Sequence, residues 1–79
     1  MPSFYIMDKI KKDIRKLVYT NRNKNSKDLR KEILQIIYKK YNLNPYCYST
    51  RYYINKYITL CLINKNSLIQ EYIFKNYIA

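Results

Sequence analysis

A large excess of positive charge on a short chain is the feature that most constrains what this sequence can form. The 79 residues include sixteen Lys and Arg against five Asp and Glu, which gives a formal net charge of +11. A chain of this length forms one domain at most, and its core buries barely enough apolar surface to offset the entropy of ordering. Self-repulsion among so many cations opposes compaction. The sequence therefore predicts a single small domain over residues 1–79 that needs an anionic partner.

Nucleic acid is the expected partner. Hydrophobic residues make up 48% of the chain and charged residues 27%, so the composition is not that of a disordered basic tail. A basic folded domain most commonly owes its charge to binding the phosphates of RNA or DNA. The alternative is a basic surface that serves solubility only, but the net charge exceeds what solubility requires of a small domain. Of the two nucleic acids, we expect RNA to be the partner.

Apolar residues recur at helical spacing in the first half of the chain. One amphipathic helix is predicted from Met7 to about Tyr19, with a separate stripe of Lys9, Lys12 and Lys16 and an apolar face of Ile6, Ile10, Ile14 and Val18. A second is predicted from Lys27 to about Tyr41, with Ser26 as its N-cap. Its expected apolar face consists of Leu29, Ile33, Ile36, Ile37 and Tyr41.

The second half of the chain predicts two further helices. Ser49 is the expected N-cap of the third, Asn64 to Asn66 is its expected end, and its expected inner face is Tyr53, Ile54, Tyr57, Ile58 and Cys61. Ser67 with Gln70 forms a capping-box pattern for a fourth helix that reaches about Tyr77. The predicted fold is all-α, a small bundle of about four short helices. A strand over 52–62 is the competing interpretation, because Tyr and Ile favour strands.

A basic cluster lies between the first two predicted helices and continues into the second. It contains Arg22, Lys24, Lys27, Arg30 and Lys31. Positions 27, 30 and 31 are neighbours on one helical face, so we expect three cations on one surface. Such a row can meet several phosphates and displace their counterions, which predicts binding that weakens steeply with salt. The alternative is a solvated face without a ligand.

Eleven tyrosines suggest a second kind of contact, the stacking of exposed rings on unpaired bases. Most of these tyrosines are expected in the core. Only Tyr19, Tyr48 and Tyr52 lie next to loops that carry Arg22 or Arg51, and these three are the stacking candidates.

Enzymatic chemistry finds no support in the residue types. The sequence has no Gly and no His, so neither a phosphate-cradling loop nor a Ser/His or Cys/His nucleophile pair is available. Asp28 and Glu32 are flanked by cations and are expected to be local salt-bridge partners. Cys47 and Cys61 are too few for a zinc site, and the sequence leaves open whether they pair. We therefore expect no cofactor, no metal and no small-molecule substrate.

Neither a membrane span nor a targeting peptide is expected. The most apolar stretch, Tyr52 to Ile63, falls well short of the roughly twenty residues that a span needs. The N-terminal residues lack the pattern of a secretory signal or a transit peptide, which suggests a protein made where it works. The dominance of Ile, Lys, Asn and Tyr and the absence of Gly indicate an A+T-rich gene, which is typical of organelle genomes and some large viruses.

The order of residues from Tyr19 onward follows a known pattern, in which an aromatic residue precedes Arg by three positions, a basic cluster follows, and a Tyr-Ser pair opens the next helix. The matching positions are Tyr19, Arg22, Lys24, Lys27, Leu29-Arg30, Ile33-Leu34, Ile37 and Tyr48-Ser49. After one inserted residue, Ile63-Asn64-Lys65 and Leu68 continue the pattern. In these positions the chain resembles the bacterial and organellar large-subunit (50S) ribosomal protein family L-twenty. The family's Trp, its turn glycine and its long basic N-terminal extension have no counterpart here.

This resemblance implies a small helical domain bound to rRNA in an organellar large ribosomal subunit, with a plastid preferred to a mitochondrion as the organelle. Neighbouring ribosomal proteins would be its other partners. It also implies that Asn64 and Lys65 form a second RNA contact, beside the phosphate contacts of Arg22, Lys24, Lys27, Arg30 and Lys31.

Other interpretations remain open. Leu29 to Leu43 is similar to the first helix of the large-subunit L-twenty-nine family. Ser26 to Ile58 looks like the small helical domain at the C-terminus of DEK-type chromatin proteins, which implies a DNA-binding domain of a viral or chromatin-associated protein. The lysine stripe on the first predicted helix is also compatible with binding at a membrane surface.

Overall fold

The computed structural model describes residues 3–78, and the side chains of residues 3–75. Within this part of the chain there are four helices and no strand, and the helices are α1 (Phe4–Thr20), α2 (Ser26–Lys40), α3 (Tyr48–Ile63) and α4 (Lys65–Ile78). The prediction of an all-α fold of about four short helices is confirmed. The strand alternative for 52–62 is wrong, because this segment lies within α3.

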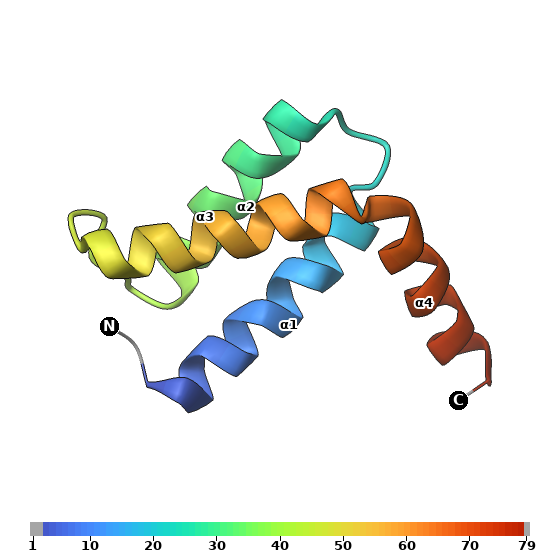
Figure 1. Cartoon of the computed structure of the whole chain (residues 1–79), viewed down its shortest axis with the longest axis horizontal. Coiled ribbons are helices and arrows are strands. Elements are labelled where there is room, and N and C mark those ends of the chain that lie inside the picture. The colour runs from blue at the N-terminus through green and yellow to red at the C-terminus, as the bar shows by residue number, and fades with distance from the viewer. Residues whose placement is uncertain (1–2, 79) are drawn as a thin grey trace.

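Helix α1 contacts each of the other three helices. In the view of Figure 1, α1 and α4 lie on the same side of α3. Helix α3 runs along the long dimension of the molecule, and α4 turns away from its end to pack against α1 and α3. The molecule measures 38 × 27 × 18 Å. Backbone contacts between α2 and α3 are sparse, so these two helices meet mainly through side chains.

The core is built from three of the four helices. Its fully buried side chains are Ile10, Ile14, Val18, Leu29, Ile33, Ile37, Ile54 and Ile58. Each contributes roughly 1.5–3 kcal/mol relative to an exposed position. Helix α4 packs the half-buried Leu68 against this core from one end. The helical repeat of the sequence therefore forms the core, which is as small as the chain length predicts.

Three of the side chains expected inside are exposed. Ile6, Ile36 and Tyr53 lie at the surface, and Tyr53 is 50% exposed. The reason is that each helix buries a stripe narrower than the full run of apolar residues. Helix α1 buries Met7 in place of Ile6, and the inward stripe of α3 runs through Thr50, Ile54, Ile58 and Cys61.

The predicted helix starts also need correction. Asn25, and not Ser26, caps α2: its side-chain oxygen accepts a hydrogen bond of 2.9 Å from the Asp28 N–H. Ser49 and Ser67 lie inside helices, since α3 begins at Tyr48 and α4 at Lys65. Serine is a frequent N-cap, but it also occupies the first turns of helices, and local sequence does not separate the two positions.

The two connections after α2 depend on asparagine. Asn42 has a φ of 49°, in the left-handed region that Asn tolerates better than most residues, and the Leu43 N–H bonds to the Tyr38 carbonyl at 3.0 Å. This arrangement ends α2 without a glycine. Between α3 and α4 only Asn64 is non-helical, so the break expected over three residues is a single-residue bend.

Candidate nucleic-acid interface

The bend at Asn64 brings the start of α4 against the loop between α1 and α2. The Lys65 Nζ donates a hydrogen bond of 3.3 Å to the backbone carbonyl of Lys24, which is 41 positions away in sequence. We call the resulting group of cations the cationic junction, and it consists of Arg22, Lys24, Lys27, Lys31 and Lys65. The two predicted contact regions, one in the loop and α2 and one at 64–65, are thus adjacent in space.

Lys27 and Lys31 occupy the first two turns of α2 and are exposed. They are four positions apart and so lie on the same side of the helix. The carboxylates beside them have other partners: Glu32 forms an ion pair with Lys24, and Asp28 accepts a hydrogen bond from the Asn25 side chain at 2.9 Å. The prediction that these two carboxylates are local salt-bridge partners is confirmed for Glu32. It is wrong for Asp28, which forms no ion pair within the described residues and takes part in the helix cap instead.

Tyr19 and Arg22 form a stack at the edge of the cationic junction. The Tyr19 ring stacks on Tyr72 with centroids 4.2 Å apart, and the Arg22 guanidinium lies 4.5 Å from the Tyr19 centroid. Arg22 also donates a hydrogen bond of 3.0 Å to the Tyr19 carbonyl. Because Tyr19 is already covered by these two groups, it offers less free surface to a base than the sequence suggested.

Arg30 differs from its neighbours in α2. It is half-buried, and its guanidinium donates to the hydroxyl of Thr59 at 2.7 Å and to the carbonyl of Asn55 at 3.4 Å. The three cations of the predicted row are therefore not equivalent. Lys27 and Lys31 face solvent, whereas Arg30 fastens α2 to α3.

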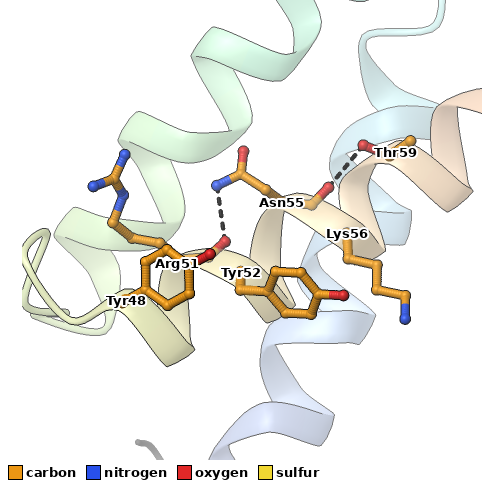
Figure 2. A pocket seen from close by; sticks show the side chains of 6 residues that line it. All are labelled: Tyr48, Arg51, Tyr52, Asn55, Lys56 and Thr59. Atoms are coloured by element: carbon orange, nitrogen blue, oxygen red, sulfur yellow. Dashed lines mark hydrogen bonds between the residues drawn. The ribbon is translucent and has the colours of Figure 1, made fainter.

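A second surface lies on the outer side of α3 and includes Arg51. Six side chains line a depression of about 350 Å³, which we call the aromatic groove: Tyr48, Arg51, Tyr52, Asn55, Lys56 and Thr59 (Figure 2). They come from positions four apart on one helix, so they form two adjacent rows. Tyr48 and Tyr52 are 78% and 52% exposed. These two rings lie outside the core. The expectation that most tyrosines lie in the core is wrong, because no tyrosine side chain that the structure describes is fully buried.

The aromatic groove continues toward the cationic junction. A neighbouring depression of about 410 Å³ lies between α2 and α3 and is lined by Ser26, Lys27, Arg30, Thr59, Leu62 and Ile63. The two depressions share Thr59. Neither lining contains an acidic side chain, and the cations that line the two depressions are Arg51, Lys56, Arg30 and Lys27.

The opposite arrangement occurs between α1 and α4. The depression of about 340 Å³ there includes Asp13 and Glu71 among its lining residues, together with four cations and Tyr72. Lys40 and the Tyr41 hydroxyl both bond to Asp13, at 2.8 and 2.5 Å. Burial alone would raise the pKa of Asp13, but these hydrogen bonds outweigh it and lower the pKa. Here two carboxylates offset part of the charge of the four cations.

The sequence missed Asn55, Lys56 and Thr59 as members of the second surface. The available signal was their spacing, since Lys56 follows Tyr52 by four positions and Asn55 and Thr59 follow Arg51 by four and eight. That spacing shows a common face of the helix. It does not show that α2 leaves this face open, which depends on how the helices pack.

The lysine stripe of α1 is partly engaged in local contacts. Lys9 lies 4.6 Å from the Tyr5 ring centroid, and Lys12 pairs with Asp8 at 3.5 Å. The apolar side of α1, which a membrane-surface helix would insert into lipid, is buried in the core. Among the residues that the structure describes, no helix has the length and apolarity to cross a bilayer.

The described residues contain no group of three or more Cys, Asp or Glu side chains arranged to hold a metal ion. Both cysteines are free thiols in the structure, with Cys47 half-buried and Cys61 buried. The pairing that the sequence left open is therefore not present here.

Comparison with known proteins does not place the chain in a family. No model of a protein family, no curated protein and no solved structure matches it.

Proposed function

We propose that this protein binds RNA and has no chemistry of its own, and that the cationic junction holds the phosphates. One observation carries the proposal: the fold gathers Lys65 with the loop and first turns of α2, although 41 residues separate Lys65 from Lys24. Lys27 and Lys31 project beside them into solvent. Cations that repel one another are stable in such a group when an anion lies against them, and a phosphate backbone supplies several at regular spacing.

The narrower proposal concerns the RNA. The resemblance of the sequence to the L-twenty family favours rRNA of an organellar large ribosomal subunit, with neighbouring ribosomal proteins as the other partners and a plastid ribosome as the location. The positions that carry this resemblance include Arg22, Lys24, Lys27 and Lys65, which are members of the cationic junction. Duplex DNA, bound by a viral or chromatin-associated domain of the DEK type, is the alternative ligand.

Charge reversal at two exposed lysines tests the surface. The variant K27E/K31E is compared with K9E/K39E, which changes the net charge equally at exposed positions on α1 and the far end of α2. Arg30 is left intact because it also fastens α2 to α3. Binding to a structured rRNA fragment is expected to fall at least tenfold for K27E/K31E and much less for K9E/K39E, since local phosphate contacts add to the effect of net charge. Equal losses would contradict a localised interface.

Competition separates the two ligands. Structured rRNA and duplex DNA of matched length compete for the wild-type protein at fixed salt, because affinities for polyanions are comparable only at the same ionic strength. The proposal requires rRNA to displace DNA more effectively than DNA displaces rRNA. Preference for DNA would favour the DEK-type alternative, and binding to neither at low salt would refute both.

A further inference from the structure

We propose that the aromatic groove of α3 binds unpaired nucleotides, with Tyr48 and Tyr52 stacking on bases and Arg51 and Lys56 contacting the phosphates between them. This inference rests on the proposed RNA-binding function and deepens it by naming the kind of segment that this second surface recognises. The cationic junction would contact the phosphate backbone of paired regions of the RNA. The aromatic groove would bind a single-stranded segment next to them.

The exposure of the two rings is the first argument. Tyr48 is 78% exposed and Tyr52 is 52% exposed, so both rings are open to solvent. They are four positions apart on α3, which corresponds to about 6 Å along the helix axis. Two exposed rings in one row along the helix therefore give the bases of a single strand faces on which to stack.

The charges around the rings favour a nucleic-acid strand over an apolar ligand. Lys56 Nζ lies 5.7 Å from the Tyr52 centroid, and Figure 2 shows both side chains on the same side of α3. Arg51 lines the same depression, and no acidic side chain does. Stacking rings beside mobile cations are the arrangement that binds single strands with little sequence preference, because every base has a face on which to stack.

The polar floor of the groove is held in place by other contacts. The Asn55 side chain donates to the Arg51 carbonyl at 2.8 Å, and the Thr59 hydroxyl donates to the Asn55 carbonyl at 2.9 Å (Figure 2). Arg30 reaches across from α2 to the same two residues. Contacts from two helices therefore hold Asn55 and Thr59 in place, and the side chains of Tyr48, Arg51, Tyr52 and Lys56 line the groove around them.

The position of the groove is compatible with a single strand of RNA that extends from the cationic junction. Thr59 borders both depressions, and Lys27 lines the second of them. From Thr59 back to Arg51 the distance along α3 is about 12 Å, a span of a few nucleotides. Duplex RNA is not the expected occupant, because its base faces are stacked within the helix and are closed to the rings.

The test compares a single strand with a duplex. Wild-type protein and the variant Y48A/Y52A are titrated with oligouridylate of about ten nucleotides and with a duplex RNA of the same length. Loss of the two rings is expected to weaken single-strand binding by at least about tenfold, from the usual contribution of base–aromatic stacking. Duplex binding is expected to stay within about twofold. The variant Y48F/Y52F keeps the rings and should retain binding.

Tyr46→Ala is the matched control. Tyr46 is 89% exposed and lies just before α3 but does not line the groove. This substitution should leave the binding of both RNAs unchanged.

Equal binding of single strands by wild type and Y48A/Y52A would overturn the inference and would favour a protein as the ligand of the groove. An equal loss on both RNAs, or wild type that binds duplex but not oligouridylate, would also overturn it while the proposed function stands. Wild type that binds neither RNA would refute both proposals.

Discussion

The guanidinium of Arg30 on α2 donates a hydrogen bond of 2.7 Å to the hydroxyl of Thr59 on α3. This contact joins two helices whose backbones hardly approach each other, at the place where the two depressions of the candidate interface meet. Arg30 therefore has a structural role in addition to the charge that it adds to the surface. Within the residues that the structure describes, its neighbours Lys27 and Lys31 make no hydrogen bond to α3.

Replacing Arg30 with Met should lower the free energy of unfolding by about 1–2 kcal/mol, because the hydrogen bonds to Thr59 and Asn55 are lost in a partly buried place. Lys31→Met, on the exposed side of the same helix, should change it by less than about 0.5 kcal/mol. Urea denaturation measures both. Similar values for the two variants would show that Arg30 does not fasten α2 to α3.

The pH dependence of stability should report on Asp13. Hydrogen bonds from Lys40 and Tyr41 outweigh burial and hold the pKa of Asp13 below its usual value of 3.8. A carboxyl whose pKa is lowered by folding stabilises the protein above its unfolded pKa, and this contribution disappears as the pH falls through the folded pKa. We expect Asp13→Asn to be less stable than wild type near neutral pH and the difference to shrink below about pH 4.

Thermal unfolding at several pH values measures this difference. The variant Asp8→Asn is the control, since Asp8 makes one exposed ion pair with Lys12 within α1 and should matter little at any pH. A stability gap between wild type and Asp13→Asn that stays constant from neutral pH to pH 2 would contradict the predicted linkage.

The two thiols should react at different rates. Hydrogen bonding from Thr50 lowers the pKa of Cys47, and the Thr50 hydroxyl lies 3.3 Å from its sulfur. Burial raises the pKa of Cys61, whose side chain is in the core. Because the thiolate is the reactive form, iodoacetamide near pH 8 should modify Cys47 first under native conditions. Mass spectrometry of peptides follows the reaction, and equal rates in the folded protein would contradict the placement of Cys61.

The sequence allowed much of the fold to be predicted. The repeat of Ile10, Ile14 and Val18 specifies a buried helical face whatever the partner helices are, because a 3.6-residue period places these side chains on one side. The ends of the helices were harder to predict. Asn25 and Ser26 are both good N-caps, and only the backbone geometry distinguishes them.

Only part of the candidate interface could be predicted from the sequence. Lys27 and Lys31 could be identified as an exposed basic pair from helical spacing alone. The inward orientation of the Arg30 side chain could not be predicted from spacing. Its partners Asn55 and Thr59 are more than twenty positions away, and the contact depends on how α2 crosses α3. The sequence predicts a break at 64–66, but the proximity of Lys65 to Lys24 also depends on how α4 packs against α1 and α3, which local sequence does not specify.

The salt dependence of RNA binding tests the central claim most directly. The logarithm of the association constant of wild-type protein for a structured rRNA fragment is measured against the logarithm of salt concentration. If the five members of the cationic junction contact phosphates, the slope should be about −3 to −5, and K27E/K31E should flatten it by about two whereas K9E/K39E should not. Weak binding with a slope near zero, or the same slope for both variants, would contradict the account.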